Sequence, residues 1–149
     1  MDKTDALLIN LLAKNADITT TELVPLVKLS LPAINKRIAK LKSSGIIRRM
    51  TVLTDAKQVG KPIIAYILVI LDQFSNAKNL VGYVESDADV LECYAVTGEY
   101  DFLLKICAAD IEALEDKLIS LKQSRGVAKS YTLLTLMEHK FSPTALPDV

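Results

Sequence analysis

One stretch of the sequence concentrates basic side chains and lacks acidic ones. From Leu23 to Thr54 there is no Asp or Glu, although the whole chain carries 18 basic and 18 acidic residues and is formally neutral. The basic residues of this stretch are Lys28, Lys36, Arg37, Lys40, Lys42, Arg48 and Arg49. Such charge asymmetry suggests an anion-binding surface whose partner is a nucleic acid. The alternative is a merely solvated helix face, but such a face usually mixes charges of both signs.

A second group of residues could bind a small zwitterion. Gly98-Glu99-Tyr100-Asp101 places two carboxylates beside a glycine in a predicted hairpin turn. Either carboxylate could bind an ammonium group, backbone N–H groups could bind a carboxylate, and Gly98 lets a ligand approach the backbone closely. The alternative is an ordinary turn, because Gly and Asp are common turn residues and Asp101 could simply fix the hairpin.

Residues suited to metal or nucleophilic chemistry are not arranged for it. Cys93 and Cys107 have neither CxxC nor Cys/His spacing and are expected to be buried apolar residues. The single histidine, His139, has no recognisable Ser/His/Asp or Cys/His pairing. We therefore expect no metal, no cofactor and no enzymatic activity. The longest apolar run, Ile63–Leu71, is too short to span a membrane, and the N-terminus lacks signal-peptide features, so we expect a cytoplasmic protein.

The basic segment falls within three predicted helices. Asp2 is a plausible cap for the first helix, and Thr19-Thr20-Thr21-Glu22 has the form of a capping box that opens the second. Ser30 can cap the third helix, which Gly45 ends. Ile46–Leu53 is expected to form a strand or wing. Three short helices, of which the third is basic and followed by a wing, predict a winged helix-turn-helix.

In such a motif the third helix enters the DNA major groove, and residues near its N-terminus meet base edges. The exposed residues expected near that end are Leu31, Asn35 and Lys36. Asn can bind adenine bidentately and Lys can donate to guanine. The residues that suit phosphates, which position without specifying, are Ser30, Lys40, Arg48 and Arg49. Arg37 could bind a phosphate or brace the motif through its apolar stem.

Beyond residue 53 the pattern predicts an α+β domain. Residues 54–61 are polar and are expected to link a DNA-binding domain at 1–53 to a second domain at 62–149. The expected strands are Ile63–Leu71, Val90–Thr97, Phe102–Cys107 and Val127–Met137. The expected helices begin at Ser75 and Asp110, and the second closes at Arg125-Gly126. This βαββαβ order is that of a ferredoxin-like fold.

The predicted sheet has more apolar surface than its helices can cover. Two helices cover only one face of a four-stranded sheet, yet Ile63–Leu71 is apolar on both faces. The hairpin strands also place large apolar residues on both faces. A second copy of the same sheet is the simplest cover. A two-fold dimer would also suit a pseudo-palindromic DNA site.

These motifs closely resemble the leucine-responsive regulatory protein and AsnC (feast/famine) family of transcription regulators. The N-terminal resemblance includes Thr21-Glu22-Leu23, Leu29-Ser30, Lys36-Arg37-Ile38 and Gly45-Ile46-Ile47. The C-terminal resemblance runs from Val90 to Asp101 and continues at Gly126-Val127 and Thr132. Two features depart from the family pattern. Lys42-Ser43-Ser44 stands where the family often has acids, which should raise nonspecific DNA affinity, and Pro25 is unusual within the second helix.

The resemblance implies a helix-turn-helix joined to a ferredoxin-like amino-acid-sensing domain, in homodimers that commonly assemble into octamers. It implies an amino-acid effector bound between dimers near the hairpin turn. The effector-binding residues implied in this way are Thr97, Gly98, Glu99, Tyr100, Asp101 and Thr132. The expected function is therefore a sequence-specific regulator of transcription whose assembly or DNA affinity changes with a small effector.

Two other functions stay open at this point. An architectural protein of the same plan would wrap DNA and ignore small ligands. A siroheme-decarboxylase-like enzyme would share the two-domain plan, but it needs groups that hold a tetrapyrrole, and a basic recognition helix would be surplus there. A visible absorption band on addition of a tetrapyrrole would distinguish the enzyme.

Overall fold

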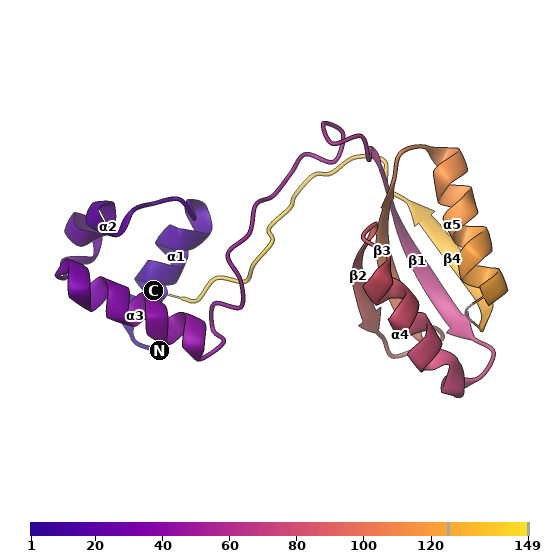
Figure 1. Ribbon diagram of the computed structural model, residues 1–149, viewed down its shortest axis with the longest axis horizontal. Coiled ribbons are helices and arrows are strands. Elements are labelled where there is room, and N and C mark those ends of the chain that lie inside the picture. The colour runs from indigo at the N-terminus through magenta and orange to yellow at the C-terminus, as the bar shows by residue number, and fades with distance from the viewer. Residues whose placement is uncertain (125, 149) are drawn as a thin grey trace. The chain divides into compact units, whose positions relative to one another are not determined.

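The structure, a computed structural model, describes residues 1–124 and 126–148. These residues form two compact units (Figure 1). One unit comprises Met1–Leu53 and the described part of the chain from Lys140 onward, and the other comprises the described residues of Thr54–His139. The sequence placed the end of the chain in the second domain, whereas the structure groups it with the first. There Asn10 Nδ2 donates to the carbonyl oxygen of Pro147 at 3.3 Å.

Two capping boxes start the first two helices. α1 (Lys3–Lys14) begins at Asp2, whose carboxylate accepts from the backbone N–H of Asp5 at 2.8 Å, while the Asp5 carboxylate accepts from the Asp2 N–H at 3.2 Å. α2 (Thr20–Val27) begins with the same exchange between Thr19 and Glu22. Each box satisfies two backbone donors that a helix start would otherwise leave unpaired. Both predicted helix starts are confirmed.

The third helix, α3 (Leu31–Ser43), is held by a small apolar core. The buried residues of this core are Leu8, Leu12, Leu23, Val27, Ile34 and Leu41. Leu8, Leu23 and Ile34, one from each helix, are fully buried. Burial of one such side chain stabilises a fold by about 1.5–3 kcal/mol. The three contributions together orient α3 against α1 and α2.

The strand expected at Ile46–Leu53 does not form. The N–H of Ile47 donates to the carbonyl of Leu41 at 3.0 Å and closes the end of α3. The residues that follow are extended, and Val52 and Leu53 are exposed. A strand needs a neighbouring strand for its backbone groups, and this segment has none among the described residues. Of the two forms expected here, a strand or a wing, the strand is therefore wrong.

The second unit is an antiparallel sheet with two helices. Its elements are β1 (Ile63–Leu71), η1 (Phe74–Asn76), α4 (Ala77–Ser86), β2 (Val90–Ala95), β3 (Phe102–Ala108), α5 (Ile111–Ser124) and β4 (Val127–Leu134). The strand order is β2-β3-β1-β4, and all three pairs are antiparallel. The predicted βαββαβ order is confirmed. Asp110 caps α5 as expected, because its carboxylate accepts from the N–H of Ala113 at 2.8 Å.

The first helix of this unit starts later than expected, because residues 74–76 form the 3-10 turn η1 before α4 begins. At the end of α5, Arg125 of the expected Arg125-Gly126 closure lies outside the described residues. Gly126 itself has a φ of +69°, a backbone conformation that glycine adopts most easily.

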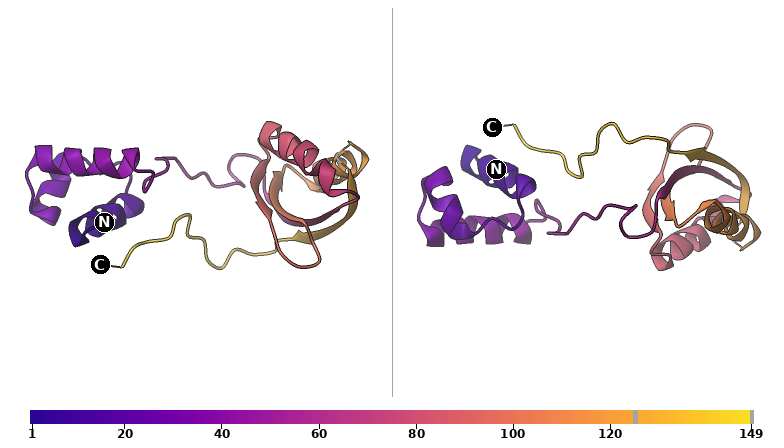
Figure 2. Two further views of the ribbon diagram at one scale, coloured as in Figure 1. Left: turned by 90° about the horizontal axis from the view of Figure 1, so that it is seen from below. Right: turned by 90° about the horizontal axis from the view of Figure 1, so that it is seen from above.

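Both helices pack on the same face of the sheet (Figure 2). Alternate residues of β1 and β3 point into this core. The buried ones are Ala65, Ile67, Val69 and Leu71 in β1, and Phe102, Leu104, Ile106 and Ala108 in β3. Leu80 of α4 and Leu121 of α5 cover them and are themselves fully buried. The core therefore buries one face of the sheet and the inner sides of both helices.

The opposite face carries no helix among the described residues. We call this side the open sheet face, and its side chains come from all four strands; those at its middle are Tyr66, Leu68, Glu92, Tyr94, Leu103, Lys105, Tyr131 and Leu133. Tyr94 is 54% exposed, Tyr131 56% and Leu133 46%. A contiguous apolar face of this kind marks an interaction surface.

Gly126 predicts a position-specific loss of stability. An added Cβ at Gly126 would overlap the side chain of Asn76, and the positive φ disfavours any L side chain. We expect Gly126→Ala to lower the free energy of unfolding by at least about 1–2 kcal/mol. The measurement is urea unfolding of the full chain.

The matched control is Gly82→Ala in the interior of α4, where a Cβ meets nothing within 4 Å. It should raise the free energy of unfolding by roughly 0.5–1 kcal/mol. Equal effects of the two substitutions would contradict the geometry at Gly126.

Candidate DNA-binding and effector sites

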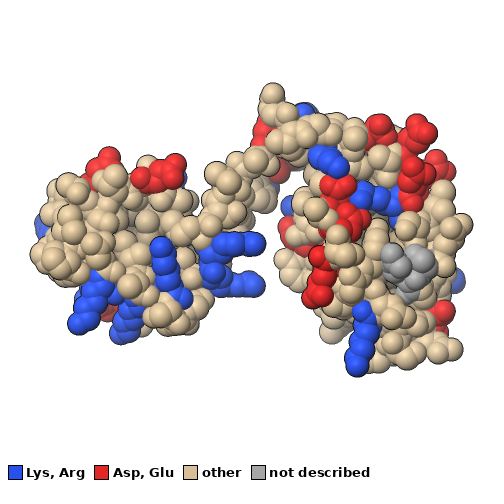
Figure 3. All heavy atoms as spheres, in the orientation of Figure 1, with Lys and Arg blue, Asp and Glu red and all other residues tan. Residues whose placement is uncertain are grey.

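The side of α3 that faces away from the core is basic. Asn35, Lys36 and Lys40 are exposed, as are Arg48 and Arg49 just beyond the helix. Figure 3 shows the Lys and Arg side chains gathered along the α3 side of the first unit, with most of its visible acids at the opposite edge. Most of the predicted DNA-binding residues thus lie on one exposed basic surface.

Asn35 is held in place by a neighbouring helix. The hydroxyl of Thr20, the first residue of α2, donates to Asn35 Oδ1 at 3.0 Å. An amide oriented in this way presents its Nδ2 donor in a defined direction, while Oδ1 has a second lone pair available. A bidentate pair with adenine would use Nδ2 and this second lone pair of Oδ1.

Arg37 braces the motif. Its Nη1 lies 2.7 Å from Asp2 Oδ2 and 2.7 Å from Asp5 Oδ1, so the guanidinium joins α3 to the capping box of α1. The pKa of Asp2 is lowered by the backbone hydrogen bond from Asp5 and by the hydrogen bond from Arg37. Of the two roles open to Arg37 from the sequence, the contacts favour bracing over phosphate binding.

The N-terminus of α3 is built from an unusual turn. Ser30 is the N-cap of α3, but its side chain makes no capping hydrogen bond, and Leu31 is 42% exposed. Lys28, two residues earlier, has a left-handed φ of 57° and donates its N–H to the carbonyl of Val24 at 2.9 Å. A left-handed conformation is unfavourable for a lysine. A lysine at this position therefore makes the turn less stable than a glycine would.

The predicted effector turn is fastened to β1 through Asp101. Its Oδ2 accepts from the N–H of Leu71 at 2.8 Å, and its own N–H donates to the carbonyl of Val69 at 2.8 Å. Gly98 has a φ of +107°, and Glu99 is exposed. Asp101 therefore does fix the hairpin through one carboxylate oxygen, while the Glu99 carboxylate is exposed at the tip of the turn.

Thr97 and Tyr100 complete the turn, whereas Thr132 lies elsewhere. Thr97 is exposed and Tyr100 half-buried, both between β2 and β3. Thr132 pairs with Ile67 at the middle of β1, four residues from Leu71. Four strand residues span roughly 13 Å. Within one chain the structure thus brings together Thr97–Asp101 but not Thr132.

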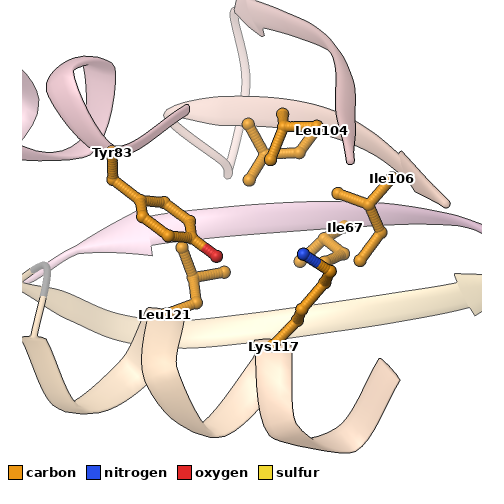
Figure 4. Close-up of a pocket in the computed structure, with 7 residues that line it drawn as sticks. Ile67, Tyr83, Leu104, Ile106, Lys117 and Leu121 are labelled. Atoms are coloured by element: carbon orange, nitrogen blue, oxygen red, sulfur yellow. The ribbon is translucent and has the colours of Figure 1, made fainter. Parts of the chain in front are cut away.

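A small pocket between the sheet and the two helices is separate from the turn (Figure 4). Its lining is mostly apolar, and its cation, Lys117, is already paired with Asp87 at 2.8 Å and with Asp89 at 3.1 Å. Lys61, at the end of the linker, lies 2.9 Å from Asp89 and lowers the pKa of that carboxyl through a hydrogen bond. This network ties the linker to the sheet, and it leaves no unpaired charge for a ligand among the residues described as lining the pocket.

Several contacts that shape the two sites join residues far apart in the chain. Asp5 is 32 residues from Arg37, Thr20 is 15 residues from Asn35, and Leu71 is 30 residues from Asp101. No local pattern encodes such partners, so the sequence did not predict them. The described residues contain no group of three metal-ligating side chains, and none of their helices is long and apolar enough to cross a membrane.

These two sites define a class of protein: a helix-turn-helix DNA-binding regulator with a separate ligand-binding domain. Residues 1–48 match the family model for a winged helix-turn-helix DNA-binding domain. Residues 64–145 match the model for the Lrp/AsnC ligand binding domain. The chain belongs to the Lrp/AsnC family of helix-turn-helix transcription regulators.

Relatives that match over nearly the full length are transcriptional regulators too. The HTH-type transcriptional regulator FL11 of Pyrococcus abyssi is 31% identical over 150 residues, which cover 99% of this chain and 96% of the relative. The transcriptional regulator AzlB of Bacillus subtilis is 30% identical, covering 94% and 91%. Among solved structures, the Neisseria meningitidis transcriptional regulator NMB0573 in complex with L-Met has a TM-score of 0.92 at 28% identity, covering 97% of this chain and 96% of that one.

The Arg37 contacts predict a change in stability rather than in the salt dependence of DNA binding. Arg37→Gln removes both ion pairs and should lower the urea midpoint of unfolding. Because the pKa of Asp2 is lowered in the fold, this contribution is fully present above the ordinary Asp pKa of about 4 and is lost as the pH falls through the lowered pKa of the folded chain. Asp5→Asn should lower the midpoint in the same way.

The control is Lys40→Gln at an exposed position of the same helix. It should leave the urea midpoint nearly unchanged and make the log–log salt slope of DNA binding shallower by about 0.9 for each phosphate that the variant no longer neutralises. The bracing role would be refuted if Arg37→Gln changed the slope and left the midpoint intact.

Proposed function

We propose that the protein is a homodimeric, sequence-specific DNA-binding regulator whose DNA affinity or assembly responds to a free amino acid bound at the β2–β3 turn. The observation that carries the DNA-binding half is the basic surface of α3, with an oriented Asn35 near its N-terminal end. This chemistry suits a helix in the major groove: Asn35 and Lys36 at base edges, and Lys40, Arg48, Arg49 and the Ser30 hydroxyl at phosphates.

The open sheet face supports the dimer. Both helices of this unit pack on the other face of the sheet, so a second sheet is the simplest cover for these exposed side chains. Two-fold pairing would present two copies of α3 to two half-sites of one duplex. Assembly of dimers into octamers extends this proposal.

The turn supports the effector half. Asp101 Oδ1 and the Glu99 carboxylate suit an ammonium, and the backbone N–H groups around Gly98 suit a carboxylate. The Neisseria relative with 28% identity was solved with L-Met, which makes an amino acid the natural class of ligand to test. A ligand can shift assembly only by its differential affinity for the assembled and separated forms.

The DNA proposal predicts steep salt dependence and separable mutant effects. Wild-type affinity for duplex DNA should fall with salt at a log–log slope of about −0.9 per phosphate neutralised. Asn35→Ala should cost about 1–3 kcal/mol at the preferred site and little at random sequence, because it removes a base contact. Fluorescence anisotropy at several salt concentrations measures both quantities.

Lys40→Gln is the comparison, and it should weaken binding to every sequence alike. Binding that ignores salt, or that keeps its sequence preference after replacement of both Asn35 and Lys36, would contradict the proposed docking of α3.

The effector proposal predicts a loss of amino-acid binding without loss of the hairpin. Asp101→Asn keeps an oxygen that can accept from the Leu71 N–H but removes the charge. A hydrogen bond to a charged group contributes about 1.5–3 kcal/mol, so amino-acid affinity should fall about 10- to 150-fold. Calorimetry against the twenty amino acids, with sedimentation of each mixture, measures binding and assembly.

DNA binding by the Asp101→Asn protein should stay close to that of wild type. If no amino acid binds the wild-type protein below the millimolar range and none changes its assembly, the protein is instead a ligand-independent architectural member of the family.

A further inference from the structure

The open sheet face has one pair of charges at its centre. Lys105 is the middle residue of β3, between Leu104 and Ile106, which point into the helix-covered core. It therefore points to the opposite side, where its partners in register are Tyr66 on β1 and Glu92 on β2. β1 and β3 are the two central strands of the sheet. The charge lies where a covering sheet would pack most closely.

This lysine is already engaged within its own chain. Its Nζ lies 3.1 Å from Glu92 Oε1 and 6.0 Å from the centre of the Tyr66 ring. The Lys105 side chain is only 16% exposed and that of Glu92 37%. Partial burial alone would lower the pKa of Lys105, but the hydrogen bond with Glu92 and the nearby charges of Glu92, Tyr66 and Glu138 together outweigh it, and the pKa is raised. This ion pair thus lies among the large apolar and aromatic side chains at the middle of the face.

Such a pair is poorly explained as a source of dimer affinity. Covering it removes both charges from water, and apolar residues of similar volume would often pack there at no loss of stability. A central charge pair can instead select among partners. A partner sheet that lacks opposite charges at the matching positions would bury Lys105 and Glu92 without ion-pair partners across the interface. In a two-fold dimer each copy presents the same neutral pair to the other, so the face is complementary to itself.

We infer that the Lys105–Glu92 pair makes the open sheet face selective for a second copy of this chain, with Lys105 of each copy facing Glu92 of the other. The inference rests on the proposed dimer and adds the chemistry of partner choice. Related sheets that lack the pair, or that carry it in the opposite arrangement, are excluded by unpaired or like charges at the centre of the interface.

The test is a charge reversal in the full chain. The double variant Lys105→Glu with Glu92→Lys keeps the net charge and a paired centre, so it should dimerise by itself. Co-expressed with wild type carrying a different mass tag, it should form few mixed dimers, because each mixed interface opposes like charges. Native mass spectrometry should find the mixed dimer reduced from the statistical one half to below about one tenth of all dimers.

Two control variants separate selection from folding. Lys78→Glu with Glu85→Lys makes the same double reversal at exposed positions of α4, on the helix side, and should give statistical mixing. Lys105→Met with Glu92→Leu removes both charges and should dimerise at least as well as wild type.

Statistical mixing of the Lys105/Glu92 reversal, or an excess of its mixed dimer, would overturn the inference. Loss of dimers in the apolar variant would also overturn it, since the pair would then serve affinity. A wild-type chain that is monomeric would instead refute the dimer of the proposed function, and a dimer that binds no DNA would refute only its DNA-binding half.

Discussion

A sheet that is apolar on both faces, with helices enough for only one, is the constraint on which the rest of this structure depends. The helix-covered face builds the core of the second unit. The other face leaves aromatic and aliphatic side chains in water, which a folded chain rarely tolerates over a continuous area. In the proposed dimer, folding of this unit and assembly of the protein are therefore coupled. Such a dimer would present two copies of α3 to two half-sites of the DNA.

The basic residues of the first unit divide into Arg37, which is paired within the fold, and the lysines that α3 leaves exposed. Arg37 forms ion pairs with Asp2 and Asp5, and these ion pairs connect α3 to the start of α1. Within the described residues, no comparable ion pair engages the exposed lysines of α3. The acid-free segment thus contains both Arg37, which holds α3 against α1, and the lysines that α3 exposes to solvent.

The sequence predicted features whose causes are local. The helix cap at Asp2, the capping box at Thr19 and the continuous apolar run of β1 follow from residue types and spacing within a few residues. The contacts that define the sites were not predictable in this way, because Asn35, Arg37 and Asp101 each bind a partner from a distant element. The strand expected at Ile46–Leu53 failed for a related reason: its residue types suit a strand, but none of the described residues provides a neighbouring strand to pair with it.

The attachment of Asp101 to Leu71 also has a mechanical consequence. Leu71 is the last residue of β1, and the first, Ile63, is separated only by Pro62 from the linker that Lys61 ties to Asp89. Nine strand residues measure roughly 30 Å; β3 pairs with β1 from Ile63 to Val69 and β4 from Ala65 to Leu71, with an irregularity between Ile70 and Leu71. One strand therefore joins the two attachments: Asp101 holds its last residue and the linker enters near its first, so that a shift of β1 along its axis would move both ends together.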